Sequence, residues 1–416
     1  MSKKVLVMSQ HFYPEIGSVG NRMKNIYKLL KQRGYDVTML TTEPTYPTRS
    51  LYDDPKFWDD SFINEADDVV RVHVKNRKYS RSIFNRLMYY LEIAYRMILF
   101  ILKDRQKYDV IVVTSPPIFT AIVALFAKAR YRTRMILDIR DLWPESLKGV
   151  GVFNYRLILW LFTKVEKLLY TKADSIIVNS QGFIKFITEQ HGIPRSKISF
   201  MPNAACSDEI ALKASGQGEF KVIYAGNIGL AQDVTILMEL AKQLKKHDIQ
   251  LTIMGYGFKK QEFMAYKEEH KLTNVNFMKP STRRECLELI STHHIGIVTL
   301  NGQEVFETVL PGKVVDYMTC SIPIVGVVSG YAKQIIETTQ SGVVIQSHDA
   351  KELLAQILYL QENPVLRAQM AKNSCEYVKK HFFWEKNISV LTDLIEEKMP
   401  SDSVQSSKAQ NKAGTL

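Results

Sequence analysis

Short runs of Val and Ile alternate with helix-like segments along nearly the whole chain, and this alternation limits the possible folds more than any other feature. Near-continuous apolar strands separated by helices are typical of parallel sheets that helices cover on both faces. We therefore predict two doubly wound α/β units in tandem, facing a central cleft. The predicted strands are 5–8, 36–40, 69–74, 110–114, 134–137 and 175–178, followed by 221–224, 250–254, 275–278, 295–300, 324–327 and 342–345.

The length of the chain also favours two domains. At 416 residues it exceeds the size at which a single hydrophobic core keeps growing. We place the first domain at 1–203, a linker that contains Ser and Gly at 204–219, and the second domain at 220–383. A terminal helix over 384–399 is expected to cross back to the first domain. The polar tail 400–416 is expected to be disordered.

Cysteine usage and hydropathy predict a protein of the cytoplasm without a membrane span. The four cysteines form no CxxC pair and are too sparse for a disulfide framework, which fits a reducing compartment. The longest uncharged segment, 110–127, contains Pro116 and Pro117 near its centre, where a spanning helix would leave backbone groups unpaired. No Asp-x-Asp motif occurs, and no metal site is predicted.

Positive charge is concentrated in the first half. Residues 1–203 carry 32 Lys and Arg against 19 Asp and Glu, whereas residues 204–416 carry 23 against 24. A basic domain beside a neutral one predicts contact with a polyanion, although a merely solvated basic face is the alternative. Nucleic acid is disfavoured because no helix-turn-helix, zinc or aromatic-basic sheet motif is present.

An anionic membrane surface is the polyanion that we favour. The segment 83–103 confines its polar residues to one narrow stripe, which is typical of a core or interfacial helix. The protein is thus expected to associate peripherally with the inner face of the cell membrane. The basic residues expected to face lipid are Arg77, Lys78, Arg81, Arg86, Lys128, Arg130, Arg132 and Arg134.

Glycine turns follow several of the predicted strands. Gly17 and Gly20 in HFYPEIGSVGNR let the backbone approach a ligand, and the helix that follows supplies free N–H groups for an anion. A plain tight turn is the alternative. Residues 224–233 open the second half in the same way, and 255–257 form another such turn. None has the third glycine of a dinucleotide fingerprint or the ending of a phosphate loop, which disfavours NAD binding and ATP hydrolysis.

The segment 304–325 is the most informative. Pro311 suits the first turn of a helix, Gly312 permits close approach, and Lys313 stands where a helix amino end meets an anion. Asp316 follows one turn later on the same face. A cation for phosphate beside a carboxylate for sugar hydroxyls suits a sugar nucleotide, whereas an exposed ion pair between the two side chains is the structural alternative.

Taken together, these motifs resemble retaining glycosyltransferases of the GT-B architecture, family 4, particularly those that build bacterial capsule and O-antigen chains. The matching segments extend over about residues 4–385 and include HFYPEIGSVGNR, LDIRDLWPES, SIIVNSQGF, MPNA, YAGNIGLAQD, IMGYG and LPGKVVDYMTCSIPIV. DIRDLWPE with P-x-K-x-x-(E/D)-Y is similar to transferases of amino-deoxysugars such as N-acetylfucosamine.

The resemblance implies two Rossmann-like domains and a specific reaction. The expected donor is a nucleotide-sugar, a UDP-linked N-acetylated amino-deoxyhexose, which is transferred with retention to a polyprenyl-diphosphate-linked saccharide. No cofactor is expected, because helix amino ends, glycine N–H groups and Lys313 can stabilise the departing diphosphate without a metal.

Some positions match the family's pattern and others depart from it. Asp316 matches the second acidic residue of the E-x7-E motif, which binds the ribose, whereas the first falls at Thr308, next to Glu307. The diphosphate-binding arginine matches Asn227, and its lysine partner falls near Gln232 or Asp233.

We therefore expect Lys313 to bind the diphosphate, assisted by Arg22 and by the N–H groups of Gly17 and Gly312. The histidine before an aspartate in the family's first-domain cleft loop matches Arg140, followed by Asp141.

The predicted catalytic residues are Lys313, Arg140, Asp141 and Glu307. The predicted donor-binding residues are Gly17, Arg22, Gly226, Asn227, Gly229, Gln232, Tyr256, Gly257, Pro311, Gly312, Lys313 and Asp316, and the predicted acceptor-binding residues are Ser18, Asn21, Arg22 and Arg140. Two alternatives stay open: a sugar-nucleotide 2-epimerase of the same fold, and a non-catalytic partner subunit.

Overall fold

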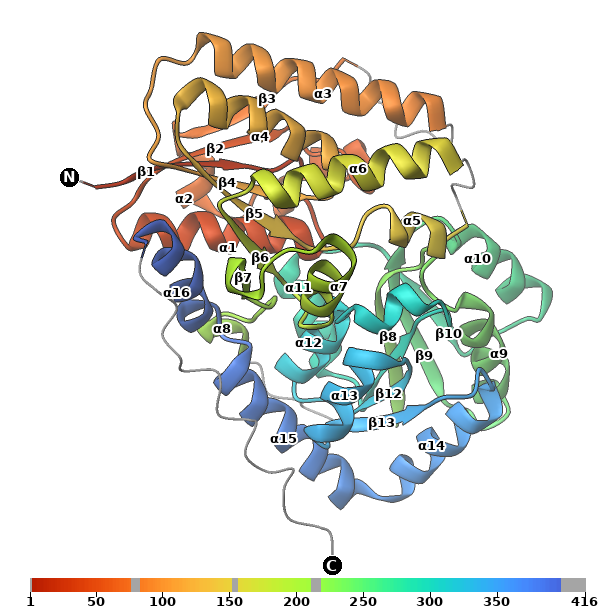
Figure 1. Ribbon diagram of the computed structural model, residues 1–416. Helices are drawn as coiled ribbons and strands as arrows, with labels where there is room; N and C mark the ends of the chain where they lie inside the picture. Colours follow the sequence, from red (N-terminus) through yellow and green to blue (C-terminus); the bar gives the residue numbers. More distant parts are fainter. Residues whose placement is uncertain (1, 76–82, 152–155, 211–217, 398–416) are drawn as a thin grey trace, which may run out of the picture.

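The computed structural model describes residues 2–75, 83–151, 156–210 and 218–397, and it contains two parallel sheets, one in each half of the chain (Figure 1). The first sheet has the strand order β3-β2-β1-β4-β5-β6-β7. Its strands are β1 Lys4–Met8, β2 Asp36–Thr42, β3 Val69–Val72, β4 Val110–Ser115, β5 Arg134–Ile139, β6 Ser175–Val178 and β7 Ile198–Phe200.

The second sheet has the order β10-β9-β8-β11-β12-β13. Its strands are β8 Lys221–Asn227, β9 Gln250–Tyr256, β10 Val275–Met278, β11 Ile295–Thr299, β12 Ile324–Val327 and β13 Gly342–Ile345. In both sheets the order reverses beside the first strand of the domain. A reversal of this kind opens a crevice at the carboxyl ends of the strands, where α/β proteins bind ligands.

Helices connect successive strands and cover both faces of each sheet. Those of the first domain are α1 Ser18–Gln32, α2 Ser61–Asn64, α3 Ile83–Lys103, α4 Ile118–Tyr131, α5 Glu145–Gly149, α6 Arg156–Lys172 and α7 Gly182–His191, with the 3-10 turns η1 Arg49–Asp53, η2 Pro55–Phe57 and η3 Arg195–Lys197. Those of the linker and second domain are α8 Ser207–Ile210, α9 Val234–Lys245, α10 Lys260–Glu269, α11 Arg283–Ser291, η4 Glu304–Thr308, α12 Gly312–Thr319, α13 Gly330–Thr338, α14 Ala350–Glu362, α15 Pro364–His381 and α16 Trp384–Ile395.

The alternation of side chains along β1 shows how the first sheet is covered. Val5 and Val7 point to the face that α1 covers, whereas Leu6 and Met8 point to the face of α3 and α4. All four side chains are fully buried. Because both faces of the strand are covered, its sequence is continuously apolar.

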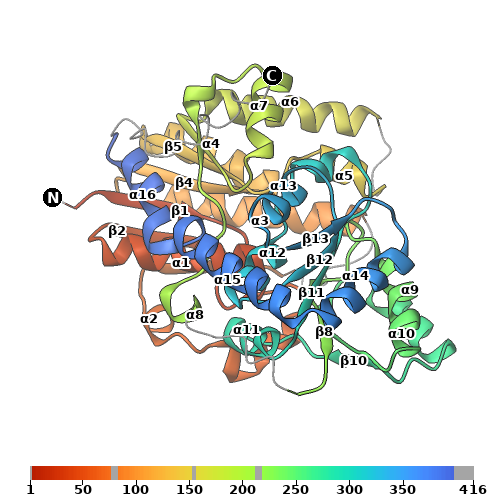
Figure 2. The same ribbon diagram turned by 90° about the horizontal axis from the view of Figure 1, so that it is seen from below.

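The chain crosses between the domains twice, and the two crossings lie side by side. The Ala205 N–H donates to the Phe382 carbonyl at 2.8 Å, and the Trp384 N–H donates to the Ala205 carbonyl at 3.0 Å. Beyond this point α16 packs along α1 of the first domain (Figure 2). Arg33 donates to the Thr392 hydroxyl at 3.0 Å and so fastens the helix to its neighbour.

The predicted fold class is confirmed, because the structure has a strand at each of the twelve predicted places. Sequence reasoning missed β7, which has only three residues. Within the described residues, no helix is both long enough and apolar enough to cross a membrane. The predicted tail 400–416 lies outside the described residues.

Candidate active site

A pocket lies in the cleft between the two domains. The first domain contributes the loop from Tyr13 to the start of α1, and the second contributes the ends of β8 and β9 with the starts of α11 and α12. Trp384, at the second crossing between the domains, also lines it. Of the residues predicted to bind donor or acceptor, the structure brings to this pocket Gly17, Ser18, Asn21, Arg22, Gly226, Tyr256, Gly312 and Asp316.

Two helix amino ends meet in this pocket. Ser18 begins α1 and Gly312 begins α12, and a Cβ atom on Gly312 would lie 3.5 Å from the Cβ of Ser18. Neither helix has a side-chain cap or an acidic residue in its first turn. Both helices therefore present free N–H groups and the positive ends of their dipoles to the same place. Such an arrangement favours an anion.

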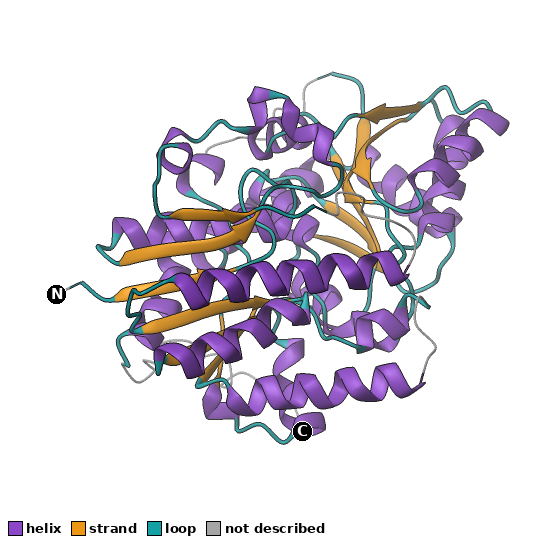
Figure 3. Ribbon diagram, turned by 90° about the horizontal axis from the view of Figure 1, so that it is seen from above, coloured by secondary structure: helices purple, strands orange, loops and turns teal. Residues whose placement is uncertain are grey.

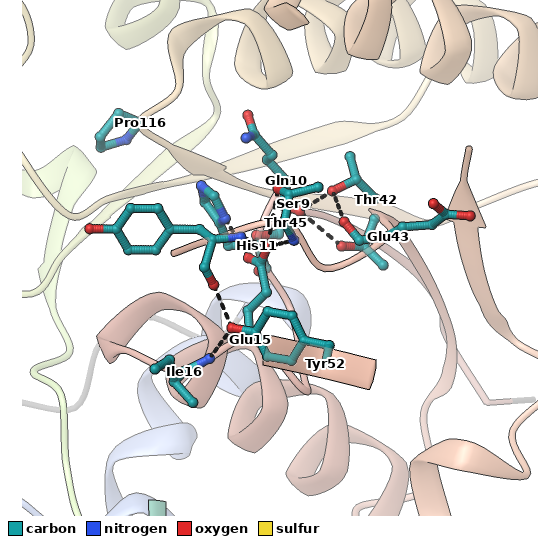
Figure 4. A network of polar contacts seen from close by, with 12 residues as sticks. Ser9, Gln10, His11, Glu15, Ile16, Thr42, Glu43, Thr45, Tyr52 and Pro116 are labelled. Atoms are coloured by element: carbon teal, nitrogen blue, oxygen red, sulfur yellow. Dashed lines mark hydrogen bonds and ion pairs between the residues drawn. The ribbon is translucent and has the colours of Figure 1, made fainter. Parts of the chain in front are cut away.

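A buried carboxylate fixes the loop that leads into α1. Glu15 is 5% exposed and accepts hydrogen bonds from the N–H groups of Thr45 at 2.5 Å and Tyr46 at 2.9 Å (Figure 4). His11 Nδ1 is 2.5 Å from Oε2 of the same carboxylate. The Tyr52 hydroxyl accepts a hydrogen bond from the Ile16 N–H at 3.1 Å. These contacts hold the backbone in place immediately before the Gly17 turn.

Glycine is required at two positions of this turn. Gly17 has a φ of 110°, in the region that side chains disfavour. At Gly20 a Cβ atom would lie 2.0 Å from the carbonyl oxygen of Glu15. The backbone of α1 therefore approaches the preceding loop more closely than any side chain allows.

Asp316 lies in the pocket and forms an ion pair that sequence reasoning missed. Arg283, at the start of α11, donates from Nη1 to Asp316 Oδ1 at 2.6 Å. Arg283 also contacts Glu209 of the linker helix, with 2.8 Å between Nε and Oε1. Burial raises the pKa of Asp316, and the ion pair opposes this rise. The contact with Arg283 uses Oδ1, which leaves Oδ2 available to a ligand.

Lys313 lies beside the pocket, against the β8 turn. Its Nζ atom is 3.7 Å from the centre of the Tyr224 ring and is buried without a hydrogen-bond partner among the described residues. Its Cε atom is 3.6 Å from where a Cβ on Gly226 would stand. Burial lowers the pKa of the Lys313 amine to about 7, with Asp316 acting in the opposite direction. The Tyr224 ring offers a cation–π contact but no counter-charge, so a bound anion would stabilise the buried ammonium.

Arg22 is placed differently from the expectation that it assists on the diphosphate. It is 1% exposed and donates to Asp138, with 2.7 Å from Nη2 to Oδ1 and 3.0 Å from Nε to Oδ2. Nη1 donates to Asn203 at 3.3 Å, and the guanidinium carbon lies 5.6 Å from the centre of the Trp384 ring. Asp138 already balances its charge, so Arg22 supports the pocket wall and supplies no free cation.

Four other predicted donor-binding residues build the turns that follow β8 and β9: Asn227, Gly229, Gln232 and Gly257. Gln232 accepts from the Gly229 N–H at 2.9 Å, and a Cβ atom on Gly257 would lie 2.3 Å from Asn227 Oδ1. These residues, with Pro311 as the N-cap of α12, shape the backbone near the pocket and do not line it.

None of the four predicted catalytic residues lines this pocket; besides Lys313, they are Arg140, Asp141 and Glu307. The Arg140 side chain donates to Thr114 Oγ1 at 2.6 Å and to the Pro116 carbonyl, and burial lowers its pKa to about 10. Asp141 is its neighbour, and burial raises the pKa of that carboxyl to about 6. Glu307 is exposed on η4. The structure does not bring these three side chains together with Asp316.

The five predicted lipid-facing basic residues that the structure describes lie at two opposite edges of the first domain. Lys128 pairs with Asp174 at 2.6 Å, and Arg134 donates to the carbonyl of Ile395 at 2.9 Å, which fastens α16. Arg130 and Arg132 are exposed at the end of α4, whereas Arg86 lies in the first turn of α3, at the opposite edge of the domain. Arg77, Lys78 and Arg81 lie outside the described residues. Among the described residues of this set, Lys128 and Arg134 thus contribute to the structure of the domain.

Two family matches together cover most of the chain. Residues 17–204 match the glycosyl transferase 4-like domain, and residues 208–377 match glycosyl transferases group 1. With the two facing parallel-sheet domains, these matches show that the chain belongs to the glycosyltransferases of the GT-B fold.

Individual relatives are distant. An Escherichia coli (strain K12) protein assigned to colanic acid biosynthesis as glycosyl transferase WcaI is 22% identical over 396 residues, which are 90% of this chain and 96% of the relative. The N-acetylgalactosamine-N,N'-diacetylbacillosaminyl-diphospho-undecaprenol 4-alpha-N-acetylgalactosaminyltransferase of Campylobacter jejuni is 30% identical over 108 residues, 25% of this chain and 29% of the relative.

A solved structure has the same fold over nearly the full length. Anabaena HepE, crystallised in complex with UDP and glucose, superposes with a TM-score of 0.69 at 15% identity and covers 95% of this chain and 100% of its own. Within the described residues of the present chain, no group of three or more His, Cys, Asp or Glu side chains is arranged to hold a metal ion.

Proposed function

We propose that this glycosyltransferase moves an N-acetylated amino-deoxyhexose, with retention, from a UDP-linked donor to a polyprenyl-diphosphate-linked saccharide during capsule or O-antigen synthesis. The enzyme would act at the cytoplasmic face of the cell membrane. Three names support this: WcaI is assigned to colanic acid biosynthesis, the Campylobacter transferase is named for a diphospho-undecaprenol acceptor, and HepE was crystallised with UDP and glucose.

The observation that carries the proposal is the meeting of two helix amino ends in the interdomain pocket. A departing nucleoside diphosphate gains negative charge as the bond from its oxygen to the sugar C1 breaks. The N–H groups at the starts of α1 and α12 would bind this charge, one set from each domain. The site would therefore be complete only when both domains contact the donor.

Lys313 and Asp316 would divide the recognition of the nucleotide. Lys313 has a buried ammonium with no partner among the described residues, and a diphosphate oxygen would supply one. The free oxygen of Asp316 would accept a hydrogen bond from a ribose hydroxyl, while Arg283 fixes the orientation of the carboxylate.

The acceptor would enter from the first domain, where Ser18 and Asn21 line the pocket beside the α1 amino end. The acceptor hydroxyl would attack C1 on the face that the leaving diphosphate vacates, and its proton would pass to the departing phosphate oxygen. This route retains the anomeric configuration and draws its charge stabilisation from helix ends and Lys313, without a metal.

The proposal is tested by thermal-shift screening with UDP, GDP, TDP and their N-acetylamino-deoxysugar derivatives, followed by transfer assays on a short prenyl-diphosphate disaccharide. We expect UDP derivatives to raise the melting temperature most. Product NMR should show the donor's anomeric configuration, and EDTA should not lower the rate. Release of an epimerised UDP-sugar without acceptor would indicate the 2-epimerase, and nucleotide binding without any turnover would indicate the non-catalytic subunit.

A further inference from the structure

The exposed apolar side chains of this protein are concentrated on three helices of the first domain. Among the described residues, 17 large hydrophobic side chains are exposed, and 12 of them lie on α3, α4 and α6. The most exposed include Tyr95 at 58% on α3, with Leu157 at 75% and Trp160 at 57% on α6. A concentration of this kind on one part of a surface marks an interaction site, whereas scattered single residues do not.

These side chains share one face. On α3, Leu91 and Tyr95 are four residues apart, as are Leu157 and Leu161 on α6, so each pair points in one direction from its helix. The three helices run side by side over the first sheet, with α4 between the other two (Figure 3). Their inner residues, such as Ile93, pack on the sheet. The outer residues therefore cover the opposite side of a single layer.

The charge of this layer identifies its partner. The three helices carry nine Lys and Arg residues and two acidic residues, Glu92 and Glu166. Glu166 is buried, 4% exposed, and accepts a hydrogen bond from Tyr170, while Glu92 accepts from the Lys75 N–H. Exposed lysines such as Lys164 stand among the apolar side chains. Apolar and aromatic side chains interspersed with Lys and Arg are suited to an anionic lipid surface.

The layer is also connected to the cleft. Aromatic rings are in contact from Tyr90 of α3 to Phe119 of α4 at 5.5 Å, then to Phe162 of α6 at 6.4 Å, and finally to Trp143 at 5.4 Å between ring centroids. Trp143 belongs to the loop after β5, whose carboxyl end faces the cleft. A bilayer along this layer would therefore lie beside the cleft entrance.

We propose that the outer face of α3, α4 and α6 rests on an anionic bilayer, with Leu157, Trp160 and Leu161 inserted among the lipid chains and the basic residues at the headgroups. This proposal rests on the proposed function, because a membrane in this position would present the lipid-linked acceptor beside the cleft. It also extends the predicted lipid contact from the basic residues of 77–86 and 128–134 to the exposed apolar side chains of the three helices.

Vesicle flotation tests the surface without using enzymatic activity. Wild-type protein should float with phosphatidylcholine vesicles that contain phosphatidylglycerol, and much less with phosphatidylcholine alone. The double variant Leu157→Ser/Trp160→Ser should bind at least about tenfold more weakly, because apolar area is no longer inserted. The matched control is Tyr359→Ser/Val365→Ser, which removes side chains that are 53% and 84% exposed on the second domain. It should bind like the wild type.

Intrinsic fluorescence provides a second measurement. Of the four tryptophans, Trp160 is 57% exposed, Trp384 is fully buried, and Trp58 and Trp143 are partly buried. Insertion should therefore shift the emission to the blue on adding anionic vesicles, and Trp160→Phe should abolish most of the shift. Lys164→Glu/Lys167→Glu should weaken binding to anionic vesicles, since attraction over a Debye length of about 8 Å is lost.

Several results would overturn the proposal. These are equal flotation of the Leu157/Trp160 variant and the wild type, equal loss in the second-domain control, or a dimer in sedimentation that this variant dissociates while vesicles are not bound. Failure of the proposed function has a different signature: vesicle binding through the layer with no transfer to any acceptor, soluble or lipid-linked. If both hold, the variant should lose activity on a long-chain acceptor and keep it on a water-soluble analogue.

Discussion

Arg22 and Lys313 are buried cations on the two helices that meet in the pocket, and only Arg22 has a carboxylate partner in the described part of the chain. Each lies in the first turns of a helix whose amino end enters the pocket. Arg22 is bound by Asp138 at 2.7 Å, whereas the Lys313 ammonium has no hydrogen-bond partner among the described residues. The folded protein thus supplies a counter-charge for Arg22, whereas a ligand would supply the one for Lys313.

The difference separates a structural charge from a functional one. A buried ion pair contributes little net stability but is costly to break, because the remaining charge stays buried. A buried charge without a counter-charge lowers the stability of the free protein, and it raises the affinity of the protein for an anionic ligand. Mutation of the paired cation should therefore mainly lower the stability of the protein. Mutation of the cation without a counter-charge should mainly weaken ligand binding.

The largest effect is expected for Arg22→Met. Removing the guanidinium leaves Asp138, 1% exposed, buried and uncompensated, which should lower the free energy of unfolding by about 3–5 kcal/mol. Chemical denaturation of wild type and variant measures this loss. The double variant Arg22→Met/Asp138→Leu should recover much of it. A variant that unfolds like the wild type but no longer binds the donor would show that Arg22 acts on the ligand and not on stability.

Lys313→Met should have the opposite profile. It removes a charge-assisted contact to the leaving diphosphate, worth about 1.5–3 kcal/mol, and should lower kcat/KM at least tenfold. Stability should stay the same or rise, since a buried charge is removed. Donor kinetics and denaturation on the same preparation give both values. Unchanged donor KM and kcat would show that the ammonium does not meet the donor.

The pH dependence follows from the pKa of Lys313, about 7 against an ordinary 10.5. The unfolded lysine holds its proton up to about 10.5, so the penalty for the buried charge is complete below pH 7 and fades as pH rises between these values. The stability advantage of Lys313→Met should shrink over that window. Donor KM should rise above pH 7, approaching about tenfold per pH unit, because only the ammonium binds phosphate. A variant with the wild-type pH profile of KM would argue against Lys313.

The smallest effects are expected at the ribose contact. Asp316→Asn should reduce discrimination against a 2′-deoxy donor by about threefold to tenfold, because the acceptor that distinguishes the two sugars is altered. Arg283→Gln should reduce the same ratio less, by freeing the carboxylate to rotate. Glu209→Gln is the matched control, since it loosens Arg283 from the linker and leaves the contact with Asp316 in place. Comparison of kcat/KM for the two donors provides the test.

Local pattern predicted nearly all of the fold. Apolar runs mark strands because both faces of these sheets are covered, and each of the twelve predicted strands is present. The exception, β7, has three residues, of which Ser199 and Phe200 are only partly buried. A segment so short carries no period that distinguishes it from a loop.

The site was predictable only where chemistry depends on local backbone. Glycine turns and helix starts indicated the pocket segments around Gly17 and Gly312, and both line it. The partner of Arg22 lies 116 residues away, and Arg283 is 33 residues from Asp316. No spacing rule connects residues so far apart, so the sequence identified the cations without showing which of them folding would neutralise.

The paired crossings of the chain determine how the cleft can change its width. Ala205 is hydrogen-bonded to Phe382 and Trp384, so the outgoing and returning segments form one short ribbon. A single connecting segment would let the domains rotate about any axis. Two connecting segments held side by side bend readily only about the line that joins them. Closure would then follow a fixed arc and bring the two helix amino ends together in the same register on every cycle, and the amides of Ala205 and Trp384 should stay protected from hydrogen exchange throughout.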